Sequence, residues 1–287
     1  MARGKYHPNV KSWADVKRNN PISPFDPSSY HYKILAEGDS WFTIGGIPMS
    51  NFLYSYRFKR STLIVNCATP GDTIKKMKDM KNNREFREAL CLTGKKLKYN
   101  LILLSAGGND LIDDSSKYIK KITEKNSTVA KDYCDDKKLD KLLKNIQDGY
   151  RKICAVRDRN SSISKNVPVL VHTYDYPTAR NAPAEFGLIT IGPWLYKTYT
   201  EKSVPEKYWK DLTDYIFYKL AEAILDLKKG GDKISNFHVF DTRNTLKRAK
   251  PDPTDFTSDW LNEIHPNMDG YRKLAIKVNS KLDKLIL

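Results

Sequence analysis

Short apolar runs alternate with longer amphipathic segments from about residue 31 to the end of the chain. Five runs have the length and composition of strands: "YKILAEG", "STLIVNCA", "KYNLILLSAGGND", "VPVLVHTYDYP" and "NFHVFDT". The third is apolar on both faces, which is typical of a strand in a parallel sheet that helices cover on both sides. The pattern therefore predicts a buried parallel sheet of about five strands.

The segments between these runs carry apolar residues at helical spacing. Met49, Phe52 and Tyr56 lie on one stripe of residues 47–60. The same periodicity recurs in residues 73–92, 137–158, 205–228 and 267–285. Strands that alternate with helices build right-handed β-α-β units. We therefore predict an α/β fold, a doubly wound three-layer α/β/α sandwich.

The first 30 residues differ from the rest, because proline and polar residues dominate them. We predict an irregular N-terminal arm over residues 1–30 and a single domain over residues 31–287. A chain of 287 residues has the size of one large α/β domain. Within the domain, residues 113–136 and 177–204 read as irregular insertions.

The chain is strongly basic, because 50 lysines and arginines outnumber 34 aspartates and glutamates, which gives a net charge of +16. Such a charge predicts weak association with anionic surfaces. It also fits a solvated lysine surface without any partner, since the basic residues are spread over the whole chain. No RNA-binding, zinc-finger or basic-zipper signature occurs, so no specific nucleic-acid partner is predicted.

Signals for a cofactor or for export are not found in the sequence. The four cysteines match no zinc spacing and are expected as free thiols, although one disulfide would also fit; they are Cys67, Cys91, Cys134 and Cys154. Neither a metal-ligand motif nor a phosphate loop occurs, so we expect no cofactor and no metal. The N-terminus lacks the apolar core of a secretory signal, and no window could span a membrane. We expect a cytoplasmic protein, unless a signal was cleaved or export follows a non-classical route.

Three candidate residues follow three of the predicted strands. Ser40 follows the first strand, Gly71 the second and Asn109 the third. The carboxyl ends of parallel strands meet at one edge of the sheet, where ligands bind in such folds. Ser40 is either the N-cap of the next helix or a nucleophile displayed at the end of a strand. His265 lies in "DWLNEIHPN", just before the last predicted helix.

Four sequence blocks, in this order, resemble the SGNH (GDSL) hydrolase superfamily. They are "GDSW" after the first strand, the glycine of "ATPGDT" after the second, "GGND" after the third, and the histidine and proline of "NEIHPN". The segments "LAEGDSWF", "HTYDYP" and "WLNEIHPN" are similar to those of bacterial GDSL-type esterases. The motifs span residues 37–266. The resemblance implies a flavodoxin-like sandwich and an esterase or lipase.

The resemblance also implies a role for each matching residue. Ser40 would be the nucleophile, and His265 would be the base that activates it. The oxyanion donors would be the backbone N–H groups of Ser40 and Gly71 and the side-chain amide of Asn109. The implied reaction hydrolyses a carboxylic ester through an acyl-enzyme. Its substrate would be a small ester: a lipid or lysophospholipid, or an acylated sugar.

One position departs from the pattern of the superfamily, which usually has an aspartate three residues before the histidine. Asn262 stands there and brings no negative charge to orient His265. A Ser-His dyad with a carbonyl oxygen orienting the imidazole would solve the problem, as would a substitute carboxylate from Asp259 or Glu263. The third alternative is an impaired enzyme, which would serve as a binding module on the hydrolase fold. An anionic-surface-binding protein is a further alternative, based on the charge alone.

Residues next to the matching blocks are candidates for the pocket. Trp41 and Phe42 follow Ser40, and they could be pocket walls or core. Asp110 follows Asn109, and we expect it to brace this loop rather than to act in catalysis. Tyr174 and Tyr176 follow the fourth strand and are predicted to line the pocket, whereas His172, inside that strand, is expected in the core.

Overall fold

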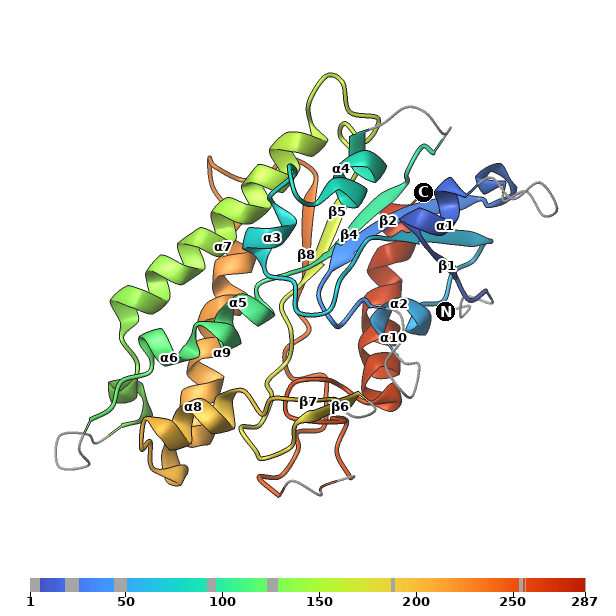
Figure 1. Cartoon of the computed structure of the whole chain (residues 1–287). Coiled ribbons are helices and arrows are strands. Elements are labelled where there is room, and N and C mark those ends of the chain that lie inside the picture. The colour runs from blue at the N-terminus through green and yellow to red at the C-terminus, as the bar shows by residue number, and fades with distance from the viewer. Residues whose placement is uncertain are drawn as a thin grey trace.

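The computed structural model describes residues 6–18, 26–43, 51–91, 97–122, 129–186, 189–252, 255 and 257–286. Its centre is a parallel sheet of six strands in the order β1-β3-β2-β4-β5-β8 (Figure 1). The strands are β1 (Asn9–Ser12), β2 (Tyr32–Gly38), β3 (Thr62–Asn66), β4 (Leu101–Ser105), β5 (Val169–His172) and β8 (Phe237–Phe240). The predicted α/β fold is confirmed, with all five predicted strands present and one more at the edge.

The central strands are buried along most of their length, as their continuous apolar runs require. Every residue of β3 and of β4 is buried. The register pairs Gly38, at the end of β2, with Ser105, at the end of β4. The segments that follow these two strands therefore leave the sheet side by side at its carboxyl edge.

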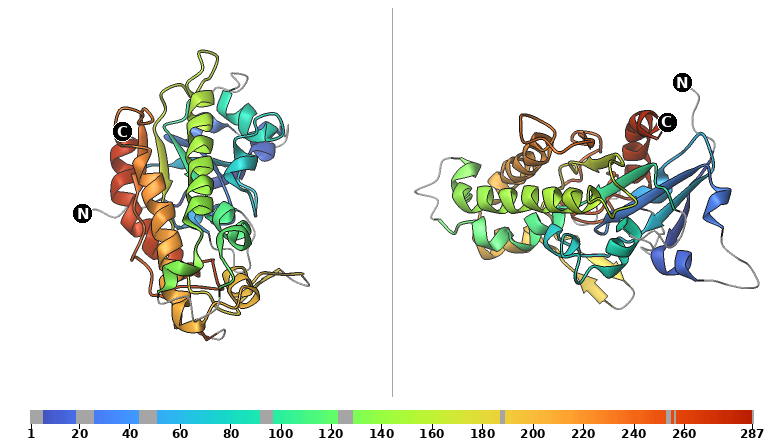
Figure 2. Two further views of the ribbon diagram at one scale, coloured as in Figure 1. Left: turned by 90° about the vertical axis from the view of Figure 1, so that its left-hand side faces the viewer. Right: turned by 90° about the horizontal axis from the view of Figure 1, so that it is seen from above.

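Helices cover both faces of the sheet (Figures 1 and 2). One layer consists of α3 (Ile74–Met77), α4 (Arg84–Cys91), α7 (Asp136–Arg157) and α9 (Trp209–Asp226). The opposite layer contains α2 (Phe52–Ser55) and α10 (Met268–Leu285). Right-handed crossovers explain the position of every helix in this division except α10, which follows the last strand. The chain moves one way along the sheet from β2 to β3 and the other way from β3 to β4, β5 and β8.

Two of the predicted helices are shorter than the sequence pattern indicates. The helix expected over 47–60 is only α2, which starts where the side chain of Asn51 accepts the backbone N–H of Tyr54. Residues 44–50, including Met49, lie outside the described residues. The helix expected over 73–92 divides into α3 and α4, because Asp79 forms a turn by accepting the side-chain amide of Asn82 at 2.7 Å.

The prediction of an irregular arm is wrong for residues 9–17. Strand β1 pairs in parallel with β3, with Val10 opposite Ile64, and α1 (Trp13–Lys17) follows it. The side chains of Val10, Trp13 and Val16 are buried. These apolar residues, spaced three apart within a polar segment, attach the segment to the sheet. A 3-10 turn, η1 (Pro27–Ser29), then leads into β2.

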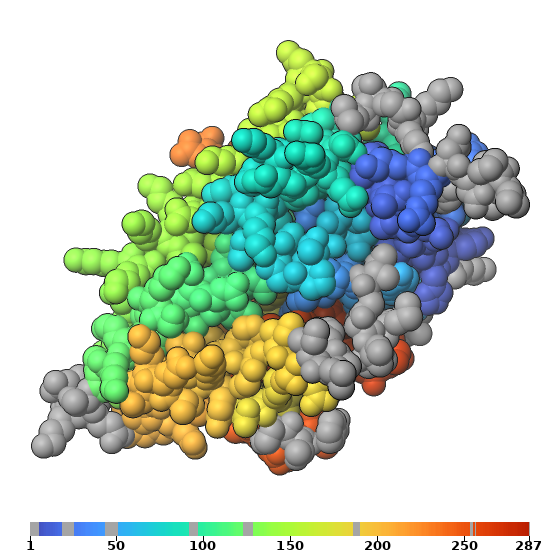
Figure 3. Space-filling view, viewed as in Figure 1, coloured from blue at the N-terminus to red at the C-terminus, as the bar shows by residue number. Residues whose placement is uncertain are grey.

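The two predicted insertions contain short regular elements rather than only irregular chain. The first holds the end of α5 (Gly108–Asp113), then α6 (Ser115–Tyr118) and η3 (Ala130–Tyr133). The second holds the antiparallel pair β6 (Ala184–Phe186) and β7 (Ile189–Ile191), then α8 (Leu195–Glu201), after which η4 (Glu206–Tyr208) leads into α9. They meet where the hydroxyl groups of Ser115 and Thr198 lie 2.7 Å apart, and they adjoin on the surface in Figure 3.

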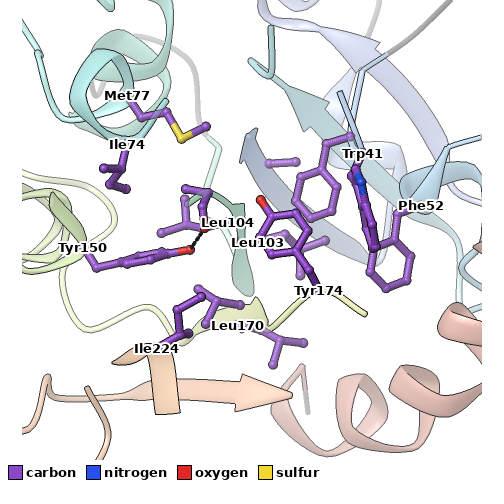
Figure 4. Packing of buried hydrophobic residues seen from close by; sticks show 14 of the residues in the cluster. Trp41, Phe52, Ile74, Met77, Leu103, Leu104, Tyr150, Leu170, Tyr174 and Ile224 are labelled. Atoms are coloured by element: carbon purple, nitrogen blue, oxygen red, sulfur yellow. Dashed lines mark hydrogen bonds between the residues drawn. The ribbon is translucent and has the colours of Figure 1, made fainter. Parts of the chain in front are cut away.

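A single cluster of buried apolar side chains runs through both layers (Figure 4). At one end of this cluster the ring of Trp41 packs edge-on against Tyr174, with 4.9 Å between the ring centroids, and against Phe52 at 6.3 Å. The aromatic residue next to Ser40 is thus part of the core. None of the helices in the described part of the chain is both long and apolar enough to cross a membrane.

Candidate active site

The turn that displays Ser40 is built by the preceding residue, Asp39. The backbone N–H of Asp39 donates to the carbonyl of Ser105 at 3.1 Å, which fixes the turn to the end of β4. The Asp39 carboxylate accepts the backbone N–H of Trp41 at 3.0 Å. The backbone carbonyl of Asp39 accepts the backbone N–H of Phe42 at 3.0 Å. The chain reverses within four residues, and Ser40 is left partly exposed at the carboxyl edge of the sheet.

A network of hydrogen bonds between buried polar side chains supports this turn. The Asp39 carboxylate also accepts the hydroxyl of Ser105, at 2.8 Å, and the hydroxyl of Tyr174. Burial raises the pKa of Asp39 to about 6. His172 Nε2 lies 2.9 Å from the same Ser105 hydroxyl, and burial lowers the pKa of His172 to about 3, so this imidazole is neutral. The structure agrees with the expectation that His172 belongs to the core.

Ser40 and His265 lie within hydrogen-bond distance of each other, although 225 positions separate them in the sequence. The Ser40 Oγ is 2.7 Å from His265 Nε2. Burial lowers the pKa of His265 to about 4, so the imidazole is neutral at pH 7. A neutral imidazole at this distance can accept the serine proton, provided that Nε2 carries the lone pair.

Asn262 determines which nitrogen carries the proton. Its Oδ1 lies 3.0 Å from His265 Nδ1, and it also accepts the backbone N–H groups of Ile264 at 3.1 Å and His265 at 2.9 Å. Two backbone donors can only face an oxygen, so the amide cannot turn its NH2 group toward the imidazole. The proton therefore lies on Nδ1, and Nε2 is free to accept the proton of Ser40.

The two carboxylates considered as substitutes for an aspartate are used elsewhere. Asp259 binds Lys273 Nζ with both oxygens, each at 2.7 Å, and accepts the backbone N–H of Lys247 at 2.6 Å. Glu263 accepts three consecutive backbone N–H groups at the start of α8. Neither of them forms a hydrogen bond with His265 among the described residues, whereas Asn262 does.

The histidine loop is tied to the rest of the site by two further side chains. Trp41 Nε1 donates to the carbonyl of Ile264 at 3.3 Å, which joins the turn that carries Ser40 to the residue before His265. The guanidinium of Arg180 is buried and donates to the carbonyl of Asn262 at 3.2 Å. Trp194 packs edge-on against His265, with 5.9 Å between the ring centroids. The imidazole is thus held on several sides.

A cavity of about 20 Å³ lies beside Ser40. Of the predicted residues, Trp41, Asn109 and Tyr174 line it. Its other apolar walls were not predicted from the sequence, and they include Ile112, Phe217, Trp260 and Ile264. Trp260 and Ile264 lie in the "DWLNEIHPN" block. Phe217 and Ile112 lie on helices, where their spacing cannot be distinguished from that of core residues.

Of the three predicted oxyanion donors, Ser40 and Asn109 lie at this cavity, and Gly71 does not line it. The amide of Asn109 donates to the carbonyl of Asp72 at 3.0 Å, which connects the loops that follow β3 and β4. Gly71 has a φ of +74°, and a Cβ there would meet no described atom within 4 Å. Backbone conformation, rather than close approach, therefore requires glycine at this position. Its part in an oxyanion hole stays a prediction.

The remaining pocket candidates lie outside the cavity lining. Phe42 is buried and packs near His172, with 5.9 Å between the ring centroids. The Asp110 carboxylate accepts the backbone N–H of Ile74 at 2.8 Å, so it braces the loop after β3, and burial raises the pKa of Asp110 to about 6. Tyr176 lines a separate surface depression that also contains Arg248.

The described residues give no sign of a metal centre, since they hold no cluster of three or more histidine, cysteine or acidic side chains in ligand geometry. All four cysteines are free thiols. The contact between Ser40 and His265 supports the chemistry of a serine activated by a neutral histidine, next to a small apolar cavity.

Comparison with known protein families gives a match for this chain. A family model described as GDSL-like lipase/acylhydrolase matches residues 34–278. A comparison with curated protein sequences gives no match.

Several solved structures are similar at low sequence identity. A putative acylhydrolase from Bacteroides fragilis is 13% identical, with a TM-score of 0.45 over 96% of this chain and 94% of that one. The aryl esterase of M. smegmatis is 14% identical, with a TM-score of 0.45 over 88% and 99%. A carbohydrate esterase of family 3 from Talaromyces cellulolyticus is 12% identical, with a TM-score of 0.44 over 89% and 98%.

Proposed function

The chain belongs to the GDSL-like lipase/acylhydrolase family and is an esterase-type hydrolase, and we propose that Ser40 and His265 carry out its reaction on esters of short acyl groups. The observation that carries the proposal is the 2.7 Å contact between Ser40 Oγ and His265 Nε2, with the proton of His265 held on Nδ1 by Asn262. This is the geometry of a nucleophile and its general base.

The proposed reaction has two halves. Ser40 Oγ attacks the acyl carbon while His265 Nε2 takes the serine proton, and the same Nε2 then gives this proton to the leaving alcohol as the C–O bond breaks. A water molecule, activated by His265, attacks the acyl-enzyme, and the carboxylic acid leaves as Ser40 regains its proton. The backbone N–H of Ser40 and the amide of Asn109 are the nearest candidates for stabilising the oxyanion, and Asn109 would exchange its bond to Asp72 for one to the substrate.

The size of the cavity favours a short acyl group. A cavity of about 20 Å³ offers room for little more than a single water-sized group, since about 10–15 Å³ of such space is needed for one water. Of the two predicted substrate classes, lipid esters and acylated sugars, the second includes acetylated sugars, whose acyl group is short enough for such a cavity. We therefore favour an acetylated sugar over a long-chain lipid.

The departure at Asn262 is not a reason to assign an inactive binding module. The amide oxygen orients the imidazole as an aspartate would, and it lacks only the negative charge that would stabilise the imidazolium. The proposal is therefore an active enzyme of the dyad type, with a side-chain carbonyl as the group that orients His265.

Active-site labelling tests the assignment of the nucleophile. A fluorophosphonate probe should label the wild type and leave Ser40→Ala unlabelled. Ser280→Ala, which changes an exposed serine on α10, is the matched control and should be labelled like the wild type. Equal labelling of Ser40→Ala and the wild type would contradict the proposal.

A chain-length series tests the acyl group independently of the nucleophile. The wild type should hydrolyse p-nitrophenyl acetate with a kcat/KM at least about ten-fold above that for the octanoate, because a long chain cannot enter the cavity without rearrangement. A preference for octanoate, with labelling still dependent on Ser40, would leave the mechanism in place and overturn the short-acyl proposal.

A further inference from the structure

We propose that a groove between α6, α7 and α8 binds an anionic polysaccharide. We call it the lysine groove, because six lysines line it: Lys117, Lys120, Lys121, Lys138, Lys141 and Lys202. Its volume is about 840 Å³, within the range of roughly 300–1,000 Å³ that ligand sites occupy. The inference goes beyond the proposed hydrolysis and does not depend on it.

The charge of the lysine groove is largely uncompensated. Among the described residues of the lining, Asp114 is the single acidic one, and it pairs with Lys117 at 2.6 Å. Lys138 pairs with Asp135 at 3.5 Å. Within the described part of the chain, the other four lysines of the lining have no ion pair, and their ammonium groups are available to a ligand. A concave surface with one sign of charge concentrates ligands of the opposite sign.

The lysines come from three separate elements that the fold holds together. α6 and the segment after it supply three, α7 supplies two, and the residue after α8 supplies Lys202 (Figure 1). The segment after α6 is fixed on its other side, because Lys120 N–H donates to the carbonyl of Tyr133 and Asp135 N–H donates to that of Tyr118. The charges therefore lie on a preformed scaffold, which reduces the entropy cost of binding.

Apolar side chains are also part of the lining of the groove. Ile122 and Leu142 are partly exposed there, and Asn145 adds an amide. Sugar rings present C–H faces toward apolar side chains and carry their carboxylate, sulfate or phosphate groups at the rim. An anionic polysaccharide therefore matches both kinds of lining residue, the apolar side chains and the lysines.

Other polyanions fit the groove less well. Single-stranded nucleic acid needs exposed aromatic side chains for base stacking. Tyr118, the one aromatic residue that the structure describes in the lining, is buried and donates its hydroxyl to the carbonyl of Leu111. A membrane surface cannot fill a concave groove, and the lining has no exposed aromatic anchor for a bilayer. An acidic peptide that adds as a strand needs a free backbone edge, and the edge at Lys120 is already paired.

The groove also begins close to the active site. Helix α5 connects Asn109, at the cavity, with Asp114, at the groove, over about 8 Å at 1.5 Å per residue.

Binding measurements with matched charge variants test the proposal. The groove variant replaces Lys120, Lys121, Lys141 and Lys202 with Gln. The control variant replaces Lys81, Lys228, Lys233 and Lys284 with Gln. These lysines are exposed, lie outside the groove and form no ion pair among the described residues. The control variant therefore has the same net charge as the groove variant. Circular dichroism and thermal unfolding verify that both variants fold.

The probe is a heparin octasaccharide, titrated by calorimetry at low and at physiological ionic strength. The wild type should bind it with an affinity that falls as salt rises. The groove variant should bind at least about ten-fold more weakly, and the control variant less than about three-fold more weakly. Equal losses in both variants, or no binding by the wild type, would overturn the proposal. Tighter groove-dependent binding of oligo-dT, polyglutamate or phosphatidylglycerol vesicles would overturn the assignment to a polysaccharide.

Discussion

The turn that carries Ser40 and the loop that carries His265 are both held by dense hydrogen bonding, but charge is used differently in the two. Behind the serine, the buried carboxylate of Asp39 accepts two side-chain hydroxyl groups and a backbone N–H. Beside the histidine, the neutral amide of Asn262 takes the position where a carboxylate would stand. The acidic side chains of that loop, Asp259 and Glu263, hold the backbone instead of the imidazole.

The comparison separates two tasks that one aspartate performs in a Ser-His-Asp triad. That aspartate fixes the tautomer of the histidine and also stabilises the imidazolium that forms during the reaction. In the proposed mechanism the first task falls to an amide that two backbone N–H groups lock in place, and the second is left without a charged group. Without a carboxylate partner, and with burial lowering its pKa to about 4, His265 stays neutral down to acidic pH. We therefore expect a slower base that works over a wider pH range.

Removal of the orienting amide should have the largest effect. Asn262→Leu has a similar shape but leaves His265 Nδ1 and two backbone N–H groups without an acceptor. We expect kcat to fall by about 10³-fold, by analogy with the roughly 10⁴-fold cost of a wrong tautomer in a serine protease. Steady-state kinetics on p-nitrophenyl acetate measure the loss. Asn262→Asp, which keeps all three acceptor contacts, is the control, and equal losses in both variants would contradict tautomer control.

A substitution of Asp39, which supports the turn that carries Ser40, should lower both the stability of the protein and its kcat. Asp39→Asn replaces one acceptor oxygen by an NH2 group that faces the Tyr174 hydroxyl or the Ser105 hydroxyl, so a buried donor loses its acceptor. We expect a loss of about 1–3 kcal/mol in the free energy of unfolding and a fall in kcat of about ten-fold as the turn loosens. Chemical denaturation and kinetics measure the two effects. Tyr174→Phe removes the hydroxyl itself, and a double-mutant cycle with Asp39→Asn should show coupling; additive effects would mean that the network does not support the turn.

Sequence reasoning predicted the parts of the fold that depend on local pattern. The strands before Ser40 and Asn109 are continuous apolar runs, and the carboxyl-edge rule brings these residues to one cavity. Strand β1 was missed, because its apolar residues are few and lie in a proline-rich, polar segment. Its burial depends on pairing with β3, more than 50 residues later, which no local pattern encodes.

The details of the site depended on long-range contacts that the sequence does not reveal. Asp259 and Glu263 were reasonable candidates for the histidine, and nothing in their spacing shows that Lys273 and the start of α8 bind them instead. The lock on the Asn262 amide is a local contact, since Ile264 and His265 are its neighbours. It becomes visible only once the backbone of the loop is known.

A negative charge added beside His265 should change the rate moderately and should shift its pH dependence. In Asn262→Asp, a carboxylate 3.0 Å from His265 Nδ1 would favour the imidazolium and raise the pKa of His265 by about 1–3 units. The base must be neutral to act, so the acid limb of kcat/KM should move from about pH 4 to higher pH, while the plateau rate rises by up to about ten-fold. A pH–rate profile measures both. An acid limb that stays in place would mean that His265 is not the titrating base.

Removal of the Asp259 carboxylate, which forms no hydrogen bond with His265, should have the smallest effect on catalysis. Asp259→Asn keeps the size of the side chain and an oxygen for the backbone N–H of Lys247, but it loses the charge that Lys273 binds. Because Lys273 is about half exposed, we expect a stability loss of only about 1 kcal/mol, or a fall of about 2–4 °C in Tm. The kcat should stay within about two-fold of the wild type and the acid limb should not move, because the carboxylate makes no hydrogen bond with His265. A collapse of kcat in a folded Asp259→Asn would show that the charge missing at position 262 is supplied from position 259 after all, and the contrast between the two regions would disappear.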